Sequence, residues 1–260
     1  MTFQQWLDAC RLPRLEARLL VEAVCRITHV RLIIRSGDEL PQPQRAVLDM
    51  LAARRRRGEP MAYLLGSREF YGRSFRVSPA VLIPRPETEL LVEAALARLP
   101  PGGQLWDLGC GSGIIGLTVA LERPDAAVRA SDISPDALAV AQANAAALGA
   151  SIEWAQGSWF AAQPAAEGLF DIIASNPPYI EAGDEHLQQG DLRFEPAAAL
   201  TDFADGLSHI RTLAAQAQGY LKPGGWLLLE HGWNQGEAVR GMLAEHGWQQ
   251  VATLRDLAGL

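Results

Sequence analysis

The architecture of this chain is clearest in the segment Leu105-Trp106-Asp107-Leu108-Gly109-Cys110-Gly111-Ser112-Gly113. A short apolar run, 105–108, precedes closely spaced glycines, and a helical pattern of apolar residues over 114–121 begins directly after them. Glycines allow the backbone to approach a ligand closely, because any side chain would block that space. This order of strand, glycine loop and helix is typical of the ligand-binding corner of a doubly wound α/β sheet.

Strand and helix patterns alternate along the rest of the chain. Apolar runs predict further strands over 128–131, 152–155, 170–175, 226–230 and 249–254. Helical periodicity predicts helices over 135–148, 206–220 and 235–246. The alternation predicts an α/β protein with a doubly wound, mainly parallel, Rossmann-like sheet.

The part of the chain before this alternation has a different pattern. Short helices are expected over 1–66, a hairpin linker over 67–83 and the α/β domain over 84–260. The first 80 residues contain 14 arginines against 8 acidic residues, whereas the remainder contains 9 basic against 22 acidic residues. A basic front suits docking onto a charged macromolecule, and an acidic body argues against broad nucleic-acid binding. The densest basic run, Arg54-Arg55-Arg56-Arg57, is more typical of the solvated end of a helix.

Composition is that of a soluble globular enzyme, with 48% hydrophobic and 20% charged residues. No run approaches the roughly 18 uninterrupted apolar residues of a membrane helix. The first five residues lack the charge and the apolar core of a signal peptide. Cys10, Cys25 and Cys110 are an odd set without a close pair, so neither a disulfide framework nor a zinc site is expected. We therefore expect a cytoplasmic protein that holds no metal.

A second motif, Asn176-Pro177-Pro178-Tyr179, follows the apolar run 170–175. Ligand chemistry in open α/β sheets lies just beyond the carboxyl ends of such strands. Asn176 offers a planar amide, and the two prolines lock the backbone and remove its donors, which leaves carbonyl groups as fixed acceptors. With the flat ring of Tyr179, these residues predict a clamp for a planar group that bears an NH2.

The glycine loop by itself leaves two cofactors open. The spacing Gly111-x-Gly113-x-x-Gly116, with Asp132 about 20 residues on, satisfies the dinucleotide fingerprint as well as a loop for S-adenosylmethionine. Asp132 ends its strand where a carboxylate could accept hydrogen bonds from ribose hydroxyls. Asp107 favours S-adenosylmethionine, because its carboxylate could orient an ammonium group but would repel a pyrophosphate. The predicted clamp also favours S-adenosylmethionine, because methyl transfer to nitrogen requires a bound NH2 group and hydride transfer does not.

With both motifs placed, the chain resembles class I S-adenosylmethionine-dependent methyltransferases. More narrowly, it resembles the HemK-type enzymes that methylate the side-chain nitrogen of glutamine in peptide-chain release factors and so modulate translation termination. The resemblance spans nearly the whole chain. Its motifs are 57–66 (RGEPMAYLLG), 83–89 (IPRPETE), 176–180 (NPPYI), 192–196 (LRFEP) and 229–232 (LEHG). The NPPY motif alone is shared with adenine N6-methyltransferases, whereas the IPRPETE loop and the helical front narrow the family.

The resemblance implies roles for particular residues. Cofactor contacts are implied for Asp107, Gly109, Cys110, Gly111, Ser112, Gly113, Asp132, Ile133, Ser158, Trp159 and Asn176. Asn176, Pro177, Pro178 and Tyr179 would hold the glutamine, with Arg85 and Glu87 at the substrate entry, and Asn176, Pro177 and Tyr179 would act in catalysis. A release factor is the implied partner, without a membrane or a direct nucleic-acid substrate.

Two features depart from the family pattern. The family usually carries an acidic residue before the Trp159 position, and this chain has Ser158, whose hydroxyl accepts hydrogen bonds without charge assistance. Class I enzymes also insert a final antiparallel strand, for which the residues after 255 leave no room. We therefore expect backbone groups on a neighbouring strand to lack partners.

Two other functions are compatible with the motifs. An adenine N6-methyltransferase on DNA or RNA would place a flipped base in the same clamp. The acidic body and the lack of a separate basic recognition domain argue against it. The chain could also be a cofactor-binding module without activity, weakened by Ser158 and by the missing strand.

Overall fold

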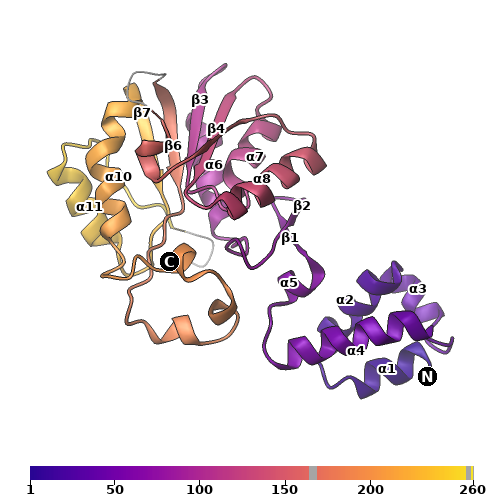
Figure 1. Cartoon of the computed structure of the whole chain (residues 1–260). Helices are drawn as coiled ribbons and strands as arrows, with labels where there is room; N and C mark the ends of the chain where they lie inside the picture. The colour runs from indigo at the N-terminus through magenta and orange to yellow at the C-terminus, as the bar shows by residue number, and fades with distance from the viewer. Residues whose placement is uncertain (164–168, 256–258, 260) are drawn as a thin grey trace. The chain divides into compact units, whose positions relative to one another are not determined.

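The computed structural model describes residues 1–163, 169–255 and 259. The chain divides into two compact units, Met1–Ser67 and Arg68–Leu260 (Figure 1).

The first unit consists of short helices around a core of its own. Its helices are α1 (Phe3–Ala9), α2 (Arg14–Cys25), α3 (His29–Ile34), α4 (Gln42–Arg56) and α5 (Met61–Leu65). Thr2 and Gln5 form a capping box at the start of α1. Trp6, Leu20 and Leu48 are almost fully buried between α1, α2 and α4. Burial of these apolar faces stabilises helices that are too short to be stable alone.

The basic run at the end of α4 is largely used within this unit. Arg54 forms an ion pair with Glu59, and Arg55 donates to both carboxylate oxygens of Glu16 on α2, at 2.8 and 2.9 Å. Arg56 donates to the carbonyl of Cys10 at 2.7 Å. These three arginines therefore hold α4 to its neighbours instead of forming an open basic surface.

The second unit begins with a hairpin of β1 (Ser67–Phe70) and β2 (Arg73–Arg76). Phe70 and Phe75 are buried in an edge-to-face contact with ring centroids 6.1 Å apart. The side-chain amide of Asn144 accepts from the Arg76 N–H at 2.7 Å and donates to the Arg76 carbonyl at 3.1 Å. The hairpin is thus joined to the α/β core by packing and by hydrogen bonds.

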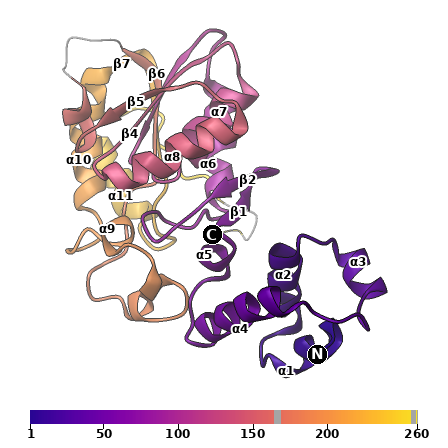
Figure 2. The same cartoon turned by 45° about the vertical axis from the view of Figure 1, so that its right-hand side comes forward.

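A five-stranded parallel sheet forms the centre of the second unit, in the order β5-β4-β3-β6-β7. Its strands are β3 (Gln104–Leu108), β4 (Ala127–Asp132), β5 (Glu153–Gln156), β6 (Phe170–Ser175) and β7 (Leu221–Leu229). The helices α6 (Thr88–Arg98), α7 (Ile114–Glu122) and α8 (Pro135–Leu148) cover one face, and α10 (Ser208–Gln216) and α11 (Gly236–Glu245) cover the other (Figures 1 and 2). The predicted doubly wound fold is confirmed.

Alternation along the strands divides the core between the two faces. Leu105 and Ile172 pack with the α6–α7 side, whereas the adjacent Trp106 and Ile173 pack with Leu213 of α10. Successive side chains of a strand point to opposite faces, so a strand buried on both sides reads as continuous apolar sequence. The Trp106 indole N–H donates to the Ser131 hydroxyl at 2.9 Å, so this buried polar group is satisfied.

The prediction of a last strand over 249–254 is wrong. Those residues pair with no strand in the part of the chain that the structure describes, and β7 pairs only with β6 there. The Thr253 hydroxyl instead accepts from Arg240 of α11 at 2.7 Å, and the Trp248 indole donates to the Ala214 carbonyl at 2.8 Å. The Arg240 side chain of α11 thus holds the segment, and a backbone carbonyl of α10 holds Trp248 just before it. Most of β7 is only partly buried, so water can reach its unpaired outer edge.

Gly113 begins α7 and has little room for a side chain. Its φ is +83°, and an added Cβ would lie 2.9 Å from Leu117 and 3.2 Å from Ala141. We expect Gly113→Ala to lower the free energy of unfolding by about 1–3 kcal/mol, through left-handed strain and overpacking. Gly149→Ala is the matched control, because its φ is +71° and no atom lies within 4 Å. Urea denaturation should give the smaller loss for Gly149→Ala, and equal losses would rule out the packing contribution.

Candidate active site

The two motifs meet at the carboxyl edge of the sheet. The glycine loop follows β3 and the NPPY motif follows β6, and these strands are paired, with Asp107 opposite Ala174. The neighbours of β3 are β4 on one side and β6 on the other, which makes this edge the switch point of the sheet. A ligand on the glycine loop and a group in the clamp would therefore lie next to each other.

The backbone of the glycine loop is held in a left-handed conformation. Gly109, Gly111 and Gly113 have φ values of +72°, +54° and +83°. The N–H groups of Gly109 and Cys110 donate to the Ser131 carbonyl at 2.9 and 3.0 Å. A Cβ added at Gly111 would meet no atom within 4 Å, so this glycine faces open space in which a ligand can approach the backbone. The Ser112 and Cys110 side chains are buried, which leaves the backbone to contact a ligand.

Asp107 is fully buried and only half satisfied. Its Oδ2 accepts from the Gly116 N–H at 2.9 Å, whereas its Oδ1 has no hydrogen-bond partner. Burial raises the pKa of Asp107 to about 7, and the nearby Asp132 carboxylate adds to the rise. An unpaired buried carboxylate oxygen suits the ammonium group of S-adenosylmethionine, so the loop fits this cofactor.

Asp132 has a structural role in addition to the one expected from the sequence. Its Oδ2 accepts from the Gly111 N–H and its Oδ1 accepts from the Ser134 N–H, both at 2.9 Å. Each carboxylate oxygen has a second lone pair, so hydrogen bonds from ribose hydroxyls remain possible. The next side chain, Ile133, is 67% exposed and offers an apolar surface beside that carboxylate.

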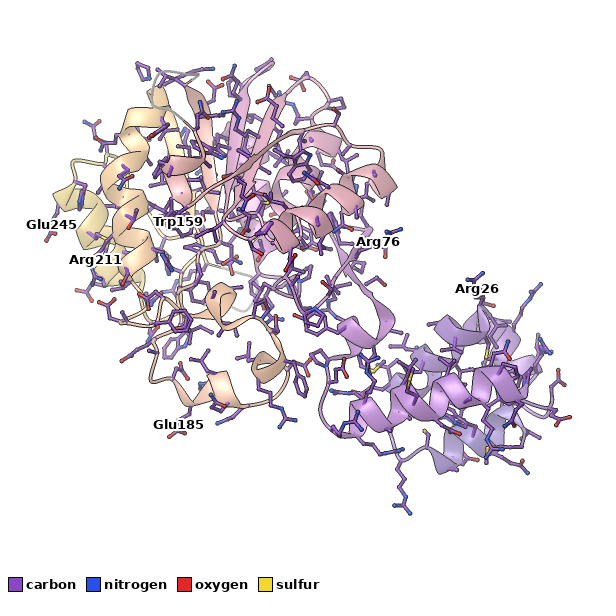
Figure 3. All side chains as sticks on the ribbon, in the orientation of Figure 1. Arg26, Arg76, Trp159, Glu185, Arg211 and Glu245 are labelled. Carbon is purple, nitrogen blue, oxygen red and sulfur yellow. The ribbon has the colours of Figure 1, made fainter. Side chains whose placement is uncertain are left out.

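Trp159 lies over the glycine loop. A Cβ at Gly109 would come within 3.3 Å of the Trp159 ring, so this glycine is needed for the indole to pack there. The ring contacts His209 of α10, with centroids 5.1 Å apart, on the α10 side of the sheet (Figure 3). Ser158 precedes it with an exposed side chain that makes no capping hydrogen bond. Trp159 thus packs against the glycine loop, and Ser158 is open to solvent beside it.

Three of the four clamp residues, Asn176, Pro177 and Tyr179, border a cavity of about 160 Å³. The cavity is lined by Leu82, Arg85, Asn176, Pro177, Tyr179, Ile180, Leu192, Ala199 and Leu200. Pro177 is buried and Pro178 is half-buried, so this backbone is held by packing as well as by its rings. The carbonyl of Tyr179 accepts from Gln235 at 2.9 Å, which fixes the end of the motif.

Two side chains that the sequence did not single out hold the clamp. Asn176 Nδ2 donates to the Thr88 hydroxyl at 3.2 Å, and that hydroxyl donates to Glu230 Oε2 at 2.7 Å. The Tyr179 hydroxyl donates to the other oxygen of Glu230 at 3.2 Å. Burial and the Glu230 carboxylate raise the pKa of Tyr179, so this phenol remains neutral. Both residues lie in motifs that the resemblance quotes, but no spacing rule connects them to Asn176.

Arg85 and Glu87 are placed differently from each other. Arg85 borders the cavity and pairs with Glu195, whose side chain is fully buried, at 2.5 Å. The second Glu195 oxygen accepts from the Ile83 N–H at 2.8 Å, so this carboxylate joins the segment after the clamp to the loop before α6. Glu87 is exposed, precedes α6 and makes no side-chain capping bond.

Glu195 offers a test of this connection. We expect Glu195→Ala to raise the KM for a protein substrate about tenfold and to lower the free energy of unfolding by about 1–3 kcal/mol, since it leaves a buried N–H and a guanidinium without their partner. Asp184→Ala is the control, because Asp184 lies in the same segment but its ion pair with His186 is largely exposed. Initial rates and urea denaturation measure both effects, and equal changes in the two variants would contradict the assignment.

The described residues contain no group of three or more His, Cys, Asp or Glu side chains that could hold a metal ion. Among the same residues, no helix is long and apolar enough to cross a membrane.

The strand order, the glycine loop and the clamp define a class I methyltransferase, and comparisons with known proteins agree. The model of the methyltransferase small domain matches residues 86–200, and that of the PrmC N-terminal domain matches residues 3–66. A Pyrococcus furiosus methyltransferase shares the fold, with a TM-score of 0.55 and 18% identity over 80% of this chain and 91% of that chain. A T. thermophilus 16S rRNA methyltransferase, solved with AdoMet and guanosine, has a TM-score of 0.50 and 25% identity over 69% of this chain and 44% of that chain.

Similarity in sequence is closer and extends over the whole chain. The release factor glutamine methyltransferase of Neisseria gonorrhoeae is 62% identical over 100% of this chain and 95% of its own length. The one from Bordetella pertussis is 51% identical over 96% of this chain and 93% of its own length. The chain belongs to the release factor glutamine methyltransferase family.

Proposed function

We propose that this enzyme transfers a methyl group from S-adenosylmethionine to the side-chain amide nitrogen of a glutamine in a peptide-chain release factor. The observation that carries the proposal is the pairing of β3 with β6, which brings the loop for the donor beside the clamp for the acceptor. The relatives' names state the release factor and the glutamine for those proteins. The chain is a methyltransferase by family, and the residue roles below are part of the proposal.

The nucleophile in this reaction is weak and has to be oriented. The lone pair of an amide nitrogen is conjugated into its carbonyl group. We assign Asn176 Oδ1 and the Pro177 carbonyl as acceptors for the two N–H bonds of the glutamine, which favours pyramidalisation and directs the lone pair. Positioning of this kind supplies about 7–11 kcal/mol of a barrier, and fixed dipoles stabilise the charge that develops on nitrogen. No strong base is required, because the proton becomes acidic once the methyl is attached.

The remaining assignments follow from position. S-Adenosylmethionine, when bound, supplies a methyl group on a positively charged sulfur. The backbone of 109–113 would hold it, with Asp107 Oδ1 at its ammonium group and Asp132 at its ribose. The other side of the bound cofactor would be lined by Ile133, Ser158 and Trp159. Ser158 provides a hydroxyl where the family usually carries a carboxylate. Tyr179 would stack on the glutamine amide, with Arg85 and Glu87 at the entry.

The division of labour between the units belongs to the same proposal. We assign docking of the release factor to 1–66, the link to 67–83 and catalysis to 84–260. Methylation of a translation factor places the enzyme in the cytoplasm, and its consequence would be altered translation termination. A membrane or a nucleic acid is not part of this scheme.

Mass spectrometry of a release factor before and after incubation with enzyme and cofactor tests the proposal. The expected result is the added mass of one methyl group on a peptide that contains the target glutamine, and no addition when that glutamine is replaced by asparagine. Parallel incubation of enzyme and cofactor with DNA and RNA shows whether a nucleic acid is methylated instead. Transfer to adenine alone would replace the proposal with a nucleic-acid methyltransferase, and binding without any transfer would leave a cofactor-binding module.

A further inference from the structure

A chain of hydrogen bonds behind the clamp joins three segments that are distant in sequence. It runs from Asn176 through the Thr88 hydroxyl to Glu230, and Tyr179 donates to the same carboxylate. Thr88 is fully buried at the start of α6, 88 residues from Asn176 and 142 from Glu230. Glu230 follows β7 directly, and its N–H donates to the Ser175 carbonyl at 3.0 Å. The groups in this hydrogen-bond chain therefore lie at the ends of β6 and β7 and at the start of α6.

The chemistry of these groups determines which group donates and which accepts at each step of the hydrogen-bond chain. The Thr88 hydroxyl donates its single hydrogen to Glu230, which in its ionised form can only accept. The oxygen of that hydroxyl can then only accept from the neighbouring amide, which places the NH2 group of Asn176 toward Thr88. Burial raises the pKa of Glu230, and hydrogen bonds donated by Thr88 and Tyr179 partly offset that rise.

We infer that Glu230, acting through Thr88, is a positioning residue that sets which end of the Asn176 amide faces the substrate. This inference rests on the proposed function and adds to it. With its NH2 group held by the Thr88 hydroxyl, which Glu230 keeps in place, Asn176 presents Oδ1 to the cavity. The glutamine NH2 then meets an acceptor, whereas a reversed Asn176 would place two NH2 groups against each other.

The same orientation would select a glutamine amide over a glutamate carboxylate. An oxygen acceptor on Asn176 repels the carboxylate of a glutamate side chain and attracts the N–H bonds of a glutamine. Without Glu230, the Thr88 hydroxyl can turn and donate to Asn176 Oδ1, which would stabilise the reversed amide equally well. The carboxylate thus acts on the substrate without being in contact with it.

Three variants test the inference. We expect Glu230→Met, which keeps the approximate volume but removes the acceptor, to lower kcat about 10²-fold. Thr88→Val should do the same, and Thr88→Ser should restore most of the turnover because it returns the hydroxyl. Cofactor affinity by calorimetry should change less than threefold in all of them. Thr118→Val is the matched control, since Thr118 of α7 is also fully buried but its hydroxyl has no partner.

The double variant tests whether Thr88 and Glu230 act through one hydrogen-bond chain or contribute independently to turnover. If they act through one chain, removing either residue already removes the whole effect. The turnover of Thr88→Val combined with Glu230→Met should then lie within about threefold of that of either single variant. Multiplied losses near 10⁴-fold would overturn the inference. Turnover in Thr88→Ser as low as in Thr88→Val would overturn it as well.

A readout without substrate keeps this test separate from that of the proposed function. The side-chain NH2 signals of Asn176, identified by their absence in Asn176→Asp, should exchange slowly with solvent in the wild-type protein. They should exchange faster in Glu230→Met and Thr88→Val and remain slow in Thr118→Val. Equal exchange in all proteins would refute the inference, whether or not a release factor is the substrate. Failure of the wild-type enzyme to methylate a release factor, with the exchange pattern as expected, would refute only the proposed function.

Discussion

Asn176→Ala is expected to keep the fold and most of the cofactor affinity and to lower turnover by about 10²- to 10³-fold, the scale of removing one polar group that acts in the transition state. The reason is that, in the proposed mechanism, this amide supplies one of the two acceptors that hold the attacking nitrogen. Loss of the side chain leaves the glutamine free to rotate and leaves the developing charge without its nearest dipole. The glycine loop does not depend on Asn176 for its shape, because its N–H groups are held by Ser131 and Asp132.

Initial rates with a release factor, calorimetry with the cofactor and thermal denaturation measure these three properties. Asn176→Asp is a second variant for the same measurements. Its carboxylate cannot donate to Thr88 and lies near Glu230, so it should be at least as slow as Asn176→Ala. Turnover unchanged in either variant would remove Asn176 from the mechanism.

The affinity for the cofactor should depend on the ionisation of Asp107. The pKa of this carboxyl is raised to about 7 by burial, so it is largely protonated at pH 6 in the ligand-free enzyme. A bound ammonium group favours the ionised form, and affinity should therefore rise between about pH 5.5 and 7.5 as less free energy is spent on ionisation. Asp107→Asn should bind about 10- to 100-fold more weakly at pH 7.5 and lose this pH dependence, since a hydrogen bond to a charged group contributes about 1.5–3 kcal/mol.

Stability of the ligand-free enzyme should vary in the opposite sense. The unfolded chain ionises Asp107 near its ordinary pKa of 3.8, while the folded chain retains the proton up to about 7. The folded state thus binds more protons in this window, and its stability falls as pH rises from about 4 to 7. Asp107→Asn removes that contribution, and the exposed Asp136→Asn serves as the control. Urea denaturation at several pH values compares them, and parallel profiles for wild type and Asp107→Asn would show that the carboxyl is not perturbed.

Local sequence patterns were sufficient for most of the fold. Apolar runs and glycine positions located β3 to β7 and the longer helices α7, α8 and α10 between them, because the periodicity of a strand or helix is a property of neighbouring residues. The prediction failed at 249–254, where the apolar pattern was read as a strand. That segment is held instead by Arg240 of α11, and the Trp248 indole just before it donates to a carbonyl of α10. No local sequence pattern reveals such contacts with distant helices.

The candidate site was predictable only in part. Asn176, Tyr179 and the glycine loop stand out because their residue types have chemical functions at the ends of strands. Glu195 does not stand out, since a buried acid paired with Arg85 looks in sequence like any charged surface residue. Asp132 was expected only as a ligand group, whereas its two bonds to Gly111 and Ser134 also brace the loop.

The order of strands and helices, the glycine turn, the clamp motif and the family were thus readable from the chain of residues alone, because each depends on short spacings. The surroundings of Asn176 were not. Thr88 and Glu230 are 142 residues apart, and only the pairing of β6 with β7 and the packing of α6 bring them to one amide. The hydrogen-bond partners of that amide come from distant parts of the sequence, and so only the tertiary structure decided them.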